Sequence, residues 1–355
     1  MKIVAVRSYL KNMALTKPYT IAYNTFTNVS IAFLEIELAN GVIGYGTGSP
    51  AEEVVGETTL ETYTNLQSDF IKQLVGRDIQ SFQQIIFETN KHFYHKPGTI
   101  AAVDLALHDA FCKFIGCSVA QYYGQKIKAL PTSVTIGIKN VQDTLAEAAG
   151  YKDLGFKILK VKTGLAVEED IERVIKLKEK FGNHFKTRVD ANQGYTLQDL
   201  QKFIAATRHA DLELIEQPMK VGTELELLGL SWADRKLIAA DESLKDSQAA
   251  LQFASNDKPF GIYNIKLMKC GGLMGALGIA TIAGNADIDL FWGCNDESIL
   301  SITAALHFAY SCPHTKYIDL DGSFDLAEDI VTGGFTLVDG EMLINHKIGF
   351  GCELS

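Results

Sequence analysis

Short apolar strands and segments of helical period alternate along the chain from about residue 131. Each strand except the last is followed by about ten or more residues with a helical pattern of apolar positions. Eight such units predict parallel strands that close into a modified TIM barrel of the (β/α)7β type, an α/β fold. The predicted strands cover residues 133–138, 157–164, 185–192, 212–218, 236–243, 261–268, 289–294 and 316–322.

The N-terminal third has a different pattern. Two apolar, β-rich runs lead into Asn40-Gly41, a pair that accepts the positive φ angles of a type I′ hairpin turn. Three segments of helical period follow, which predicts a small antiparallel sheet covered by helices. The two runs cover residues 2–10 and 29–38, and the helical segments cover 58–75, 80–93 and 99–115.

These patterns divide the chain into an α+β capping domain and a barrel. We expect the capping domain over residues 1–125 and the catalytic (β/α) barrel over residues 126–321. The tail, residues 322–355, regains β character around a Val338-Asp339-Gly340 turn. We expect this tail to pack back on the capping domain and complete it.

Composition excludes several classes of protein. The 355 residues are 47% hydrophobic and carry a formal charge of -10, and no cluster of Lys and Arg is interleaved with aromatic residues, so nucleic acid is not an expected partner. The first residues lack the apolar core of a signal peptide, and no apolar run has the length of a membrane span. The sequence therefore predicts a cytoplasmic protein without a membrane partner. Its six cysteines form no CxxC pair, which favours reduced thiols over structural zinc.

Four ionisable residues occur at equivalent points of successive units. Asp190, Glu216, Asp241 and Lys266 each close a predicted strand and are separated by 26, 25 and 25 residues. Because the carboxyl ends of parallel strands form the mouth of a barrel, these side chains are expected to meet there. Helix caps and turns are the alternative for any single one of them, but three carboxylates in phase favour a site.

Three converging carboxylates repel one another unless a cation lies between them. Ligation by oxygen alone, with neither His nor Cys, is typical of Mg²⁺, with Mn²⁺ as a substitute. Such an ion polarises a bound carboxylate and makes the neighbouring carbon more acidic. The sequence therefore predicts a magnesium site at Asp190, Glu216 and Asp241.

Two lysines stand two residues apart in the strand "KILKVKTG". Strand alternation puts Lys160 and Lys162 on the same face, which is either a solvated face or the inside of the mouth. In the mouth, they would face Lys266 across the barrel, and a base on each side of a carbon permits its inversion. Lys160 is expected to hold a substrate carboxylate oxygen and, by repulsion, to lower the pKa of Lys162 toward the roughly 7 to 8 that suits a general base.

Taken together, the motifs resemble the enolase superfamily, in its muconate-lactonizing-enzyme subgroup and within it the dipeptide epimerases. The resemblance covers nearly the whole chain and depends on "KVK", "DANQGY", "IEQP", "DES", "IKLMKCGG" and the helix "AAVDLALHDAFCKFIG". It implies Mg²⁺ on the three acids, with Lys162 and Lys266 as the acid/base pair around an enediolate. The predicted activity is that of an isomerase which inverts the α-carbon of the C-terminal residue of a dipeptide.

The end of the last predicted strand, "YIDLDGSF", indicates the substrate. Asp319 and Asp321 form an i, i+2 pair, and in dipeptide epimerases a matching Asp-x-Asp receives the α-ammonium of the substrate. Turn formation at Asp321-Gly322 is the alternative. The resemblance also implies substrate contacts from Thr135, Lys160, Cys294 and Asp296, with Glu297 tethering Lys266.

The segment 16–30, "TKPYTIAYNTFTNVS", is expected to form a loop that covers the mouth. It offers Tyr19, Ile21, Tyr23 and Phe26 but no arginine to hold a glutamate side chain. These residues predict an apolar second residue in the dipeptide, although ordinary packing would use the same side chains.

Other functions stay open at this point. The same metal and lysines serve N-acylamino acid racemases, o-succinylbenzoate synthases and cycloisomerases, but the substrates of these enzymes lack the ammonium that Asp319 and Asp321 would bind. A Schiff-base lysine in an aldolase-like barrel is a different class of enzyme. A non-catalytic metal-binding or ligand-binding barrel is a third class, and homo-oligomer formation is left open by the sequence.

Overall fold

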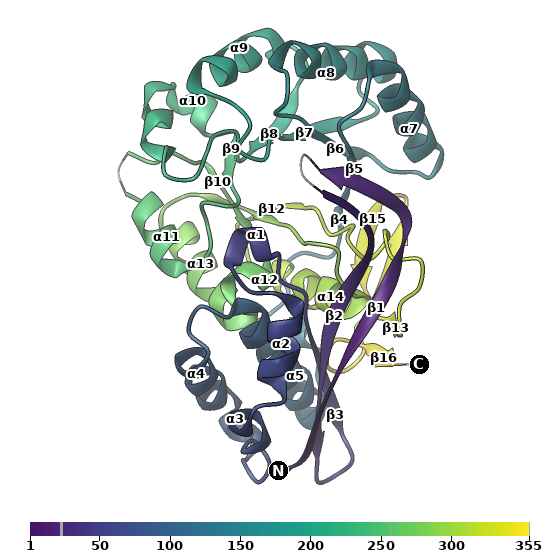
Figure 1. The fold of residues 1–355 in the computed structure, drawn as a ribbon, viewed down its shortest axis with the longest axis vertical. Helices are drawn as coiled ribbons and strands as arrows, with labels where there is room; N and C mark the ends of the chain where they lie inside the picture. Colours follow the sequence, from purple (N-terminus) through teal and green to yellow (C-terminus); the bar gives the residue numbers. More distant parts are fainter. Residues whose placement is uncertain (22–23, 256, 355) are drawn as a thin grey trace.

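The computed structural model describes residues 1–21, 24–255 and 257–354, and the side chains of 17–26 lie outside this description (Figure 1). The chain begins with an antiparallel sheet in the order β1-β2-β3, and six α-helices and one 3-10 helix follow. The strands are β1 Ile3–Ile21, β2 Asn24–Leu38 and β3 Ile43–Gly48. The helices are α1 Glu52–Val55, α2 Thr59–Leu66, α3 Asp69–Lys72, η1 Ile79–Ser81, α4 Phe82–His92, α5 Pro97–Ile115 and α6 Val119–Tyr123.

The barrel is built from eight parallel strands in chain order, as the sequence predicts. The strands are β5 Ser133–Ile136, β6 Ile158–Lys162, β7 Lys186–Asp190, β8 Leu212–Glu216, β9 Ile238–Ala240, β10 Ile262–Ile265, β11 Asp289–Trp292 and β12 Thr315–Ile318. The helices around them are α7 Val141–Asp153, α8 Val167–Phe181, α9 Leu197–Thr207, η2 Glu224–Gly229, α10 Trp232–Arg235, α11 Ser247–Phe253, α12 Leu267–Cys270, α13 Leu273–Asn285 and α14 Ile299–Ala309.

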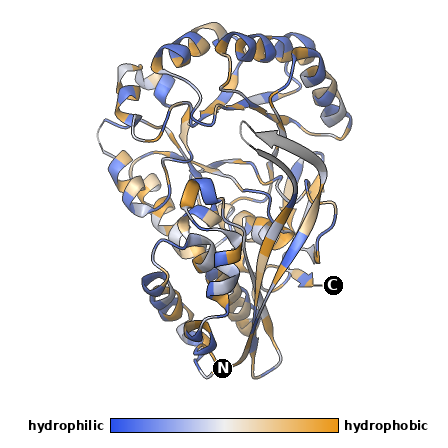
Figure 2. Cartoon of the chain, viewed as in Figure 1, coloured by the Kyte–Doolittle hydropathy of each residue, from blue (hydrophilic) through white to orange (hydrophobic). Residues whose placement is uncertain are grey.

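Hydropathy follows this arrangement. Helices α8 and α9 alternate between hydrophobic and hydrophilic residues, because one face packs on the strands and the other meets water (Figure 2). In contrast, α14 has ten buried residues among eleven, since it lies between the barrel and the capping domain. The fold class predicted from the sequence is therefore confirmed.

Three local predictions differ from the structure. The helical segment 58–75 divides into α2 and α3, since Ser68 takes an extended conformation that ends one helix and begins the next. After β8 the chain forms the 3-10 helix η2 and the one-turn α10, and α11 after β9 has only seven residues. The described residues of segment 16–30 continue the β1–β2 ladder instead of an irregular loop, with Tyr19 paired to Phe26, and the predicted cover over the mouth stays a prediction.

The seam between β12 and β5 closes the barrel. A parallel bridge joins Thr132 to Ile318, and the Leu320 N–H donates to Thr132 Oγ1 at 2.9 Å. A short strand just before the seam pairs with the tail, whose elements also form a second ladder. These strands are β4 Leu130–Pro131, β13 Val331–Gly333, β14 Phe335–Val338, β15 Glu341–Ile344 and β16 Cys352–Leu354.

The tail also contacts α5 and α6. The Phe350 N–H donates to Asp109 Oδ1 at 2.9 Å, and the Val119 N–H donates to the Gly349 carbonyl at 3.0 Å. Further along β1, Leu15 forms a bridge with Leu326. Among the described residues, no helix has both the length and the apolar character needed to cross a bilayer.

Candidate active site

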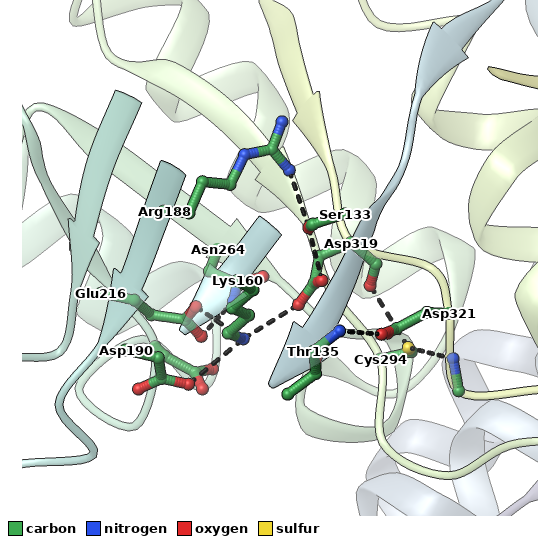
Figure 3. A network of polar contacts seen from close by, with 12 residues as sticks. Ser133, Thr135, Lys160, Arg188, Asp190, Glu216, Asn264, Cys294, Asp319 and Asp321 are labelled. Carbon is green, nitrogen blue, oxygen red and sulfur yellow. Dashed lines mark hydrogen bonds and ion pairs between the residues drawn. The ribbon is translucent and has the colours of Figure 1, made fainter. Parts of the chain in front are cut away.

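The charged residues singled out in the sequence meet at the carboxyl ends of strands β6 to β10. Lys162 is in register with Asp190, and Asp190 is in register with Glu216, so three neighbouring strands end in ionisable side chains. Asp241 and Lys266 come one residue after β9 and β10. The three acids are buried at this end of the barrel, and the side chains of Asp190 and Glu216 both point toward Lys160 (Figure 3).

Lys160 lies at the centre of this cluster. Its Nζ is 2.7 Å from Glu216 Oε2, 3.1 Å from Asp190 Oδ2 and 2.9 Å from Asp319 Oδ2. Burial alone would lower the pKa of Lys160, but the carboxylates of Asp319 and Glu216 raise it well above its ordinary value. Lys160 is therefore a buried ammonium that holds three carboxylates together. The alternative prediction, that Lys160 lies on a solvated strand face, is wrong.

Two of the acids have opposite shifts. Burial and the charge of Asp190 raise the pKa of Glu216 to about 8. For Asp190 burial also raises the pKa, but the ammonium groups of Lys162 and Lys160 outweigh it, and the pKa falls to about 2. Asn264 on β10 fixes Glu216 by donating to its Oε1 at 2.8 Å.

Asp241 lies between two lysines. Its Oδ2 is 2.9 Å from Lys266 Nζ, and its Oδ1 pairs with Lys269 Nζ. The backbone is held as well, because Gln217 Oε1 accepts from the Asp241 N–H at 2.9 Å. The side chain of Asp241 is thus fixed from several sides.

Lys162 is the more exposed of the two predicted acid/base residues. Its Nζ donates to Asp190 Oδ2 at 2.7 Å and to Asn192 Oδ1 at 3.0 Å, and its side chain is 30% exposed. The side chain of Lys266 is 14% exposed and approaches the cluster from β10, with β7, β8 and β9 between the two lysines. The structure thus brings both lysines to the same group of acids from different strands.

The acid cluster has the donors of a hard divalent cation. Asp190, Glu216 and Asp241 offer only carboxylate oxygens, and burial together with the charge of Asp190 disfavours the ionised form of Glu216, which a bound cation would favour. In the part of the chain that the structure describes, no three His, Cys, Asp or Glu side chains are placed to hold a metal ion together. The lysine ammonium groups explain this, since Lys160 lies between two of the acids and Lys266 is paired with the third. The residue types fit Mg²⁺, provided that these ion pairs rearrange.

Asp319 and Asp321, expected to act as a pair, have different surroundings. Asp319 accepts from Ser133 Oγ at 2.6 Å in addition to its ion pair with Lys160, and these contacts lower its pKa against the effect of burial. Asp321 accepts from the Thr135 N–H at 3.0 Å, and burial together with the charge of Asp319 raises its pKa well above the ordinary value. Asp321 is therefore the less compensated of the two anions.

The loop after β11 holds the remaining predicted residues. The Cys294 thiol donates to the Asp319 carbonyl and accepts from the Gly322 N–H, both at 3.3 Å, so it clamps the aspartate loop. Asp296 is partly exposed in the same loop. Glu297 accepts from the Asn295 N–H at 2.9 Å, and burial raises its pKa to about 7. Its hydrogen bonds go to Asn295 and Ser301, and the charge of Lys266 acts on the same carboxyl by lowering its pKa.

Sequence reasoning missed five buried residues that support the cluster. Each lies within two or three residues of a predicted site residue, either in a strand or in the turn that follows it, and this spacing was the available signal. They are Ser133, Arg188, Gln217, Asn264 and Lys269.

Two family descriptions match most of the chain. Residues 3–124 match "Mandelate racemase / muconate lactonizing enzyme, N-terminal domain", and residues 143–355 match "Enolase C-terminal domain-like". These two matches include the capping sheet, nearly all of the barrel and the tail.

Similar proteins extend over the full length. The chain is 49% identical over 354 residues to the L-Lys-D/L-Arg epimerase of Desulforapulum autotrophicum, with 99% of each chain covered. It is 34% identical over 356 residues to the hydrophobic dipeptide epimerase of Enterococcus faecalis, again with 99% of each chain covered. The solved structure of a dipeptide epimerase from Methylococcus capsulatus, complexed with Mg and the dipeptide L-Arg-D-Lys, matches with a TM-score of 0.97 at 43% identity and 99% coverage of each chain.

Proposed function

Because the chain belongs to the enolase superfamily, in its mandelate racemase/muconate lactonizing enzyme branch, we propose that it is a Mg²⁺-dependent dipeptide epimerase. In this proposal the enzyme inverts the α-carbon of the C-terminal residue of a dipeptide. The observation that carries it is the placement of Lys162 and Lys266 on strands that flank three buried carboxylates. The names of the relatives and the Mg²⁺ bound in the Methylococcus capsulatus structure support the same activity.

The carboxylates of Asp190, Glu216 and Asp241 would hold the Mg²⁺, for which Mn²⁺ would substitute. When bound, the ion supplies positive charge that stabilises the substrate carboxylate as the α-proton leaves. Asn264 keeps Glu216 oriented, and Lys269 and Gln217 keep Asp241 oriented, so these acids are held before the cation arrives.

The two lysines would transfer the protons. One lysine amine takes the α-proton, and the bonding electrons pass into the substrate carboxylate to give an enediolate. The other lysine donates a proton to the opposite face of the same carbon, and the configuration is inverted. Lys162 and Lys266 exchange these roles for the opposite configuration of the substrate. Lys160 would pair with a substrate carboxylate oxygen after its ammonium, which has three N–H donors, releases one of the three carboxylates that it holds.

The ammonium of the dipeptide would bind mainly to Asp321. Asp319 already pairs with Lys160 and accepts from Ser133, whereas Asp321 has no ion pair among the described residues and accepts hydrogen bonds from Thr135. A cationic group at Asp321 would offset the burial and the charge of Asp319 that together raise its pKa. This feature favours a dipeptide over an N-acylated amino acid, which has no ammonium. Thr135, Cys294 and Asp296 would line the same end of the site.

The second residue of the dipeptide has two candidates. The apolar preference predicted from Tyr19, Ile21, Tyr23 and Phe26 depends on side chains outside the described residues, and it stays a prediction. A cationic second residue is the competing candidate, since the relative at 49% identity is an L-Lys-D/L-Arg epimerase. The hydrophobic dipeptide epimerase at 34% identity supports the apolar choice.

Exchange of the α-proton in D₂O tests the proposal. The purified protein is incubated with Mg²⁺ and a panel of L,L-dipeptides whose second residue is apolar, cationic or acidic, together with N-acetylated amino acids. Mass gain at the C-terminal α-carbon and formation of the L,D-isomer identify the substrate. Absence of exchange with every dipeptide would reject the proposal, and exchange confined to N-acylated amino acids would favour racemase activity.

Variants separate this mechanism from the other classes. Lys162→Ala and Lys266→Ala are expected to lower epimerisation by about 10²–10⁴-fold, the usual contribution of a positioned acid or base. Lys186→Ala is the matched control, because Lys186 begins β7 at the other end of the barrel and pairs with Asp211 on the surface. Trapping of a carbonyl substrate by borohydride would instead support a Schiff-base lysine.

A further inference from the structure

Arg188 is a buried arginine that crosses the barrel interior below the acid cluster. It is 2% exposed and is in register with Lys160 on the neighbouring strand, so two cations face the same interior layer side by side. Its guanidinium lies 5.5 Å from the ring centre of Phe291 and 5.3 Å from that of Tyr317. A buried charge of this kind is retained only when polar partners compensate it.

The partners of Arg188 lie on both sides of the barrel seam. Nη1 donates to Ser133 Oγ on β5 at 3.0 Å and to the Ile318 carbonyl on β12 at 2.6 Å, and Nε donates to Glu213 at 2.9 Å. The regular ladder is interrupted at this seam, where the residues of the described chain form a single bridge. One planar guanidinium therefore fastens the two strands that carry opposite sides of the predicted ammonium site.

Ser133 extends this contact to Asp319. Its hydroxyl accepts from Arg188 and donates to Asp319 Oδ1 at 2.6 Å, while Asp319 Oδ2 pairs with Lys160 (Figure 3). Asp319 thus compensates two buried cations, one directly and one through a hydroxyl. Both of its oxygens are engaged by the protein.

The same contacts fix the loop that carries Asp321. Arg188 holds the carbonyl of Ile318 and, through Ser133, the side chain of Asp319. Cys294 clamps the Asp319 carbonyl and the Gly322 N–H on either side of Asp321. Loss of the Arg188 or Ser133 hydrogen bonds would therefore remove part of the support of Asp319 and of the neighbouring Asp321.

We propose that Arg188 and Ser133 are positioning residues for recognition of the substrate ammonium: by holding Asp319 on Lys160 they keep Asp321 placed for the cation. The inference rests on the proposed function and deepens it. It assigns Asp319 to the framework of the site and leaves proton transfer to Lys162 and Lys266.

The test compares a dipeptide with its N-acetylated form in three variants. For Ser133→Ala and Arg188→Lys, the KM for the free dipeptide is expected to rise about tenfold while kcat changes less than about threefold, as for lost ground-state binding. Weak turnover of the N-acetylated dipeptide is expected to stay unchanged, because it presents no ammonium. The matched control is Tyr263→Phe, which removes a buried hydroxyl that donates to the Ala250 carbonyl at 2.7 Å, away from the barrel interior.

The outcomes distinguish the two proposals. If the wild-type protein epimerises no dipeptide, the proposed function fails, and this inference fails with it. If the wild type is active but Ser133→Ala behaves like Tyr263→Phe, the inference alone is overturned. Equal losses on the free and the N-acetylated dipeptide would also overturn it, since they indicate a general effect on the fold. Circular dichroism identifies a variant that does not fold, and Ser133→Ala carries the test if an arginine variant fails.

Discussion

The Lys269 ammonium donates a 2.6 Å hydrogen bond to the backbone carbonyl of Asp241 and forms an ion pair with the carboxylate of the same residue. It also donates to the Asn264 carbonyl at 3.1 Å, and it is 6% exposed. These three contacts of one buried ammonium link helix α12, which carries Lys269, to strand β10 and to the end of β9. Lys269 therefore acts on the structure of the acid cluster rather than on the substrate.

Removal of this ammonium is expected to destabilise the fold. In Lys269→Met, Asp241 loses one of its two lysine partners while it stays buried, and loss of a partner in such a pair costs about 3–5 kcal/mol. Urea denaturation of the metal-free protein measures the change in the free energy of unfolding. The control is Lys347→Met, whose pair with Glu353 is exposed and is expected to leave stability close to that of the wild type. Equal stability of the two variants would contradict the role given to Lys269.

A second prediction concerns Gly164, two residues after Lys162. Its φ is +101°, and a Cβ there would lie 2.2 Å from the carbonyl oxygen of Ala191 in the loop after β7. The Gly164 N–H donates to the buried Asp170 at 2.8 Å, which fixes the turn from the other side. Gly164→Ala would therefore push apart two loops that follow Lys162 and Asp190, and we expect kcat to fall about 10²-fold because the reacting groups are displaced.

Gly116→Ala is the control for this substitution. Gly116 ends α5 with a φ of +76°, and a Cβ there would meet no atom within 4 Å. Alanine is strained in this left-handed backbone conformation, but its Cβ collides with no neighbouring atom. The kinetic constants of the variant are therefore expected to match those of the wild type. Unchanged kcat in Gly164→Ala would show that the two loops tolerate the displacement.

Metal removal is expected to abolish activity and leave the fold intact. Four lysines pair with the acids of the cluster: Lys160, Lys162, Lys266 and Lys269. Chelation with EDTA should therefore keep the circular dichroism spectrum while epimerisation falls to background. Mg²⁺ should restore activity and raise stability by about 2.7 kcal/mol at a concentration of 100 times its Kd. Unfolding on chelation would show that the lysine pairs do not compensate the acids.

The sequence predicts those features that depend on the pattern of apolar residues within a single strand. The strand-end positions of Asp190, Glu216 and Asp241 could be predicted because each follows an apolar run at the same point of a repeat, and such a periodic pattern requires no knowledge of the neighbouring strands. The capping domain was similarly visible in its change of period. Both predictions depend on the local spacing of apolar residues, which can be read from the sequence alone.

The remaining features depend on contacts between strands. Arg188 in "FKTRVDAN" shares the strand face of Asp190, but a charged residue there is equally compatible with a solvated position, and the register with Lys160 and the contact with Ser133 show that it is buried. The different surroundings of Asp319 and Asp321 likewise arise from side chains on β5 and β6. The segment 16–30 contains Pro18 and several polar residues, typical of a loop, but in its described part cross-strand pairs such as Tyr19 with Phe26 continue the β1–β2 ladder.

The last prediction concerns His307, a buried histidine on α14. Its Nδ1 accepts from the Ala120 N–H of α6 at 3.3 Å, which requires the unprotonated nitrogen. Burial, with a smaller effect of His346, lowers the pKa of His307 to about 3. Between this value and the ordinary value of about 6.5, the unfolded chain binds a proton that the folded chain does not. The contribution of His307 is therefore complete above about pH 6.5 and is lost as the pH falls toward 3, by up to about 1.4 kcal/mol per pH unit.

His307→Asn isolates this effect, because the Asn Oδ1 can accept from the same N–H but does not titrate. The free energy of unfolding is measured by urea denaturation from pH 7 to pH 4 for the wild type and the variant. Other acids contribute equally to both proteins, so the difference between the two curves reports His307. We expect the wild type to lose stability more steeply than the variant across this range. Parallel curves would show that His307 accepts its proton without disturbing the contact between α14 and α6.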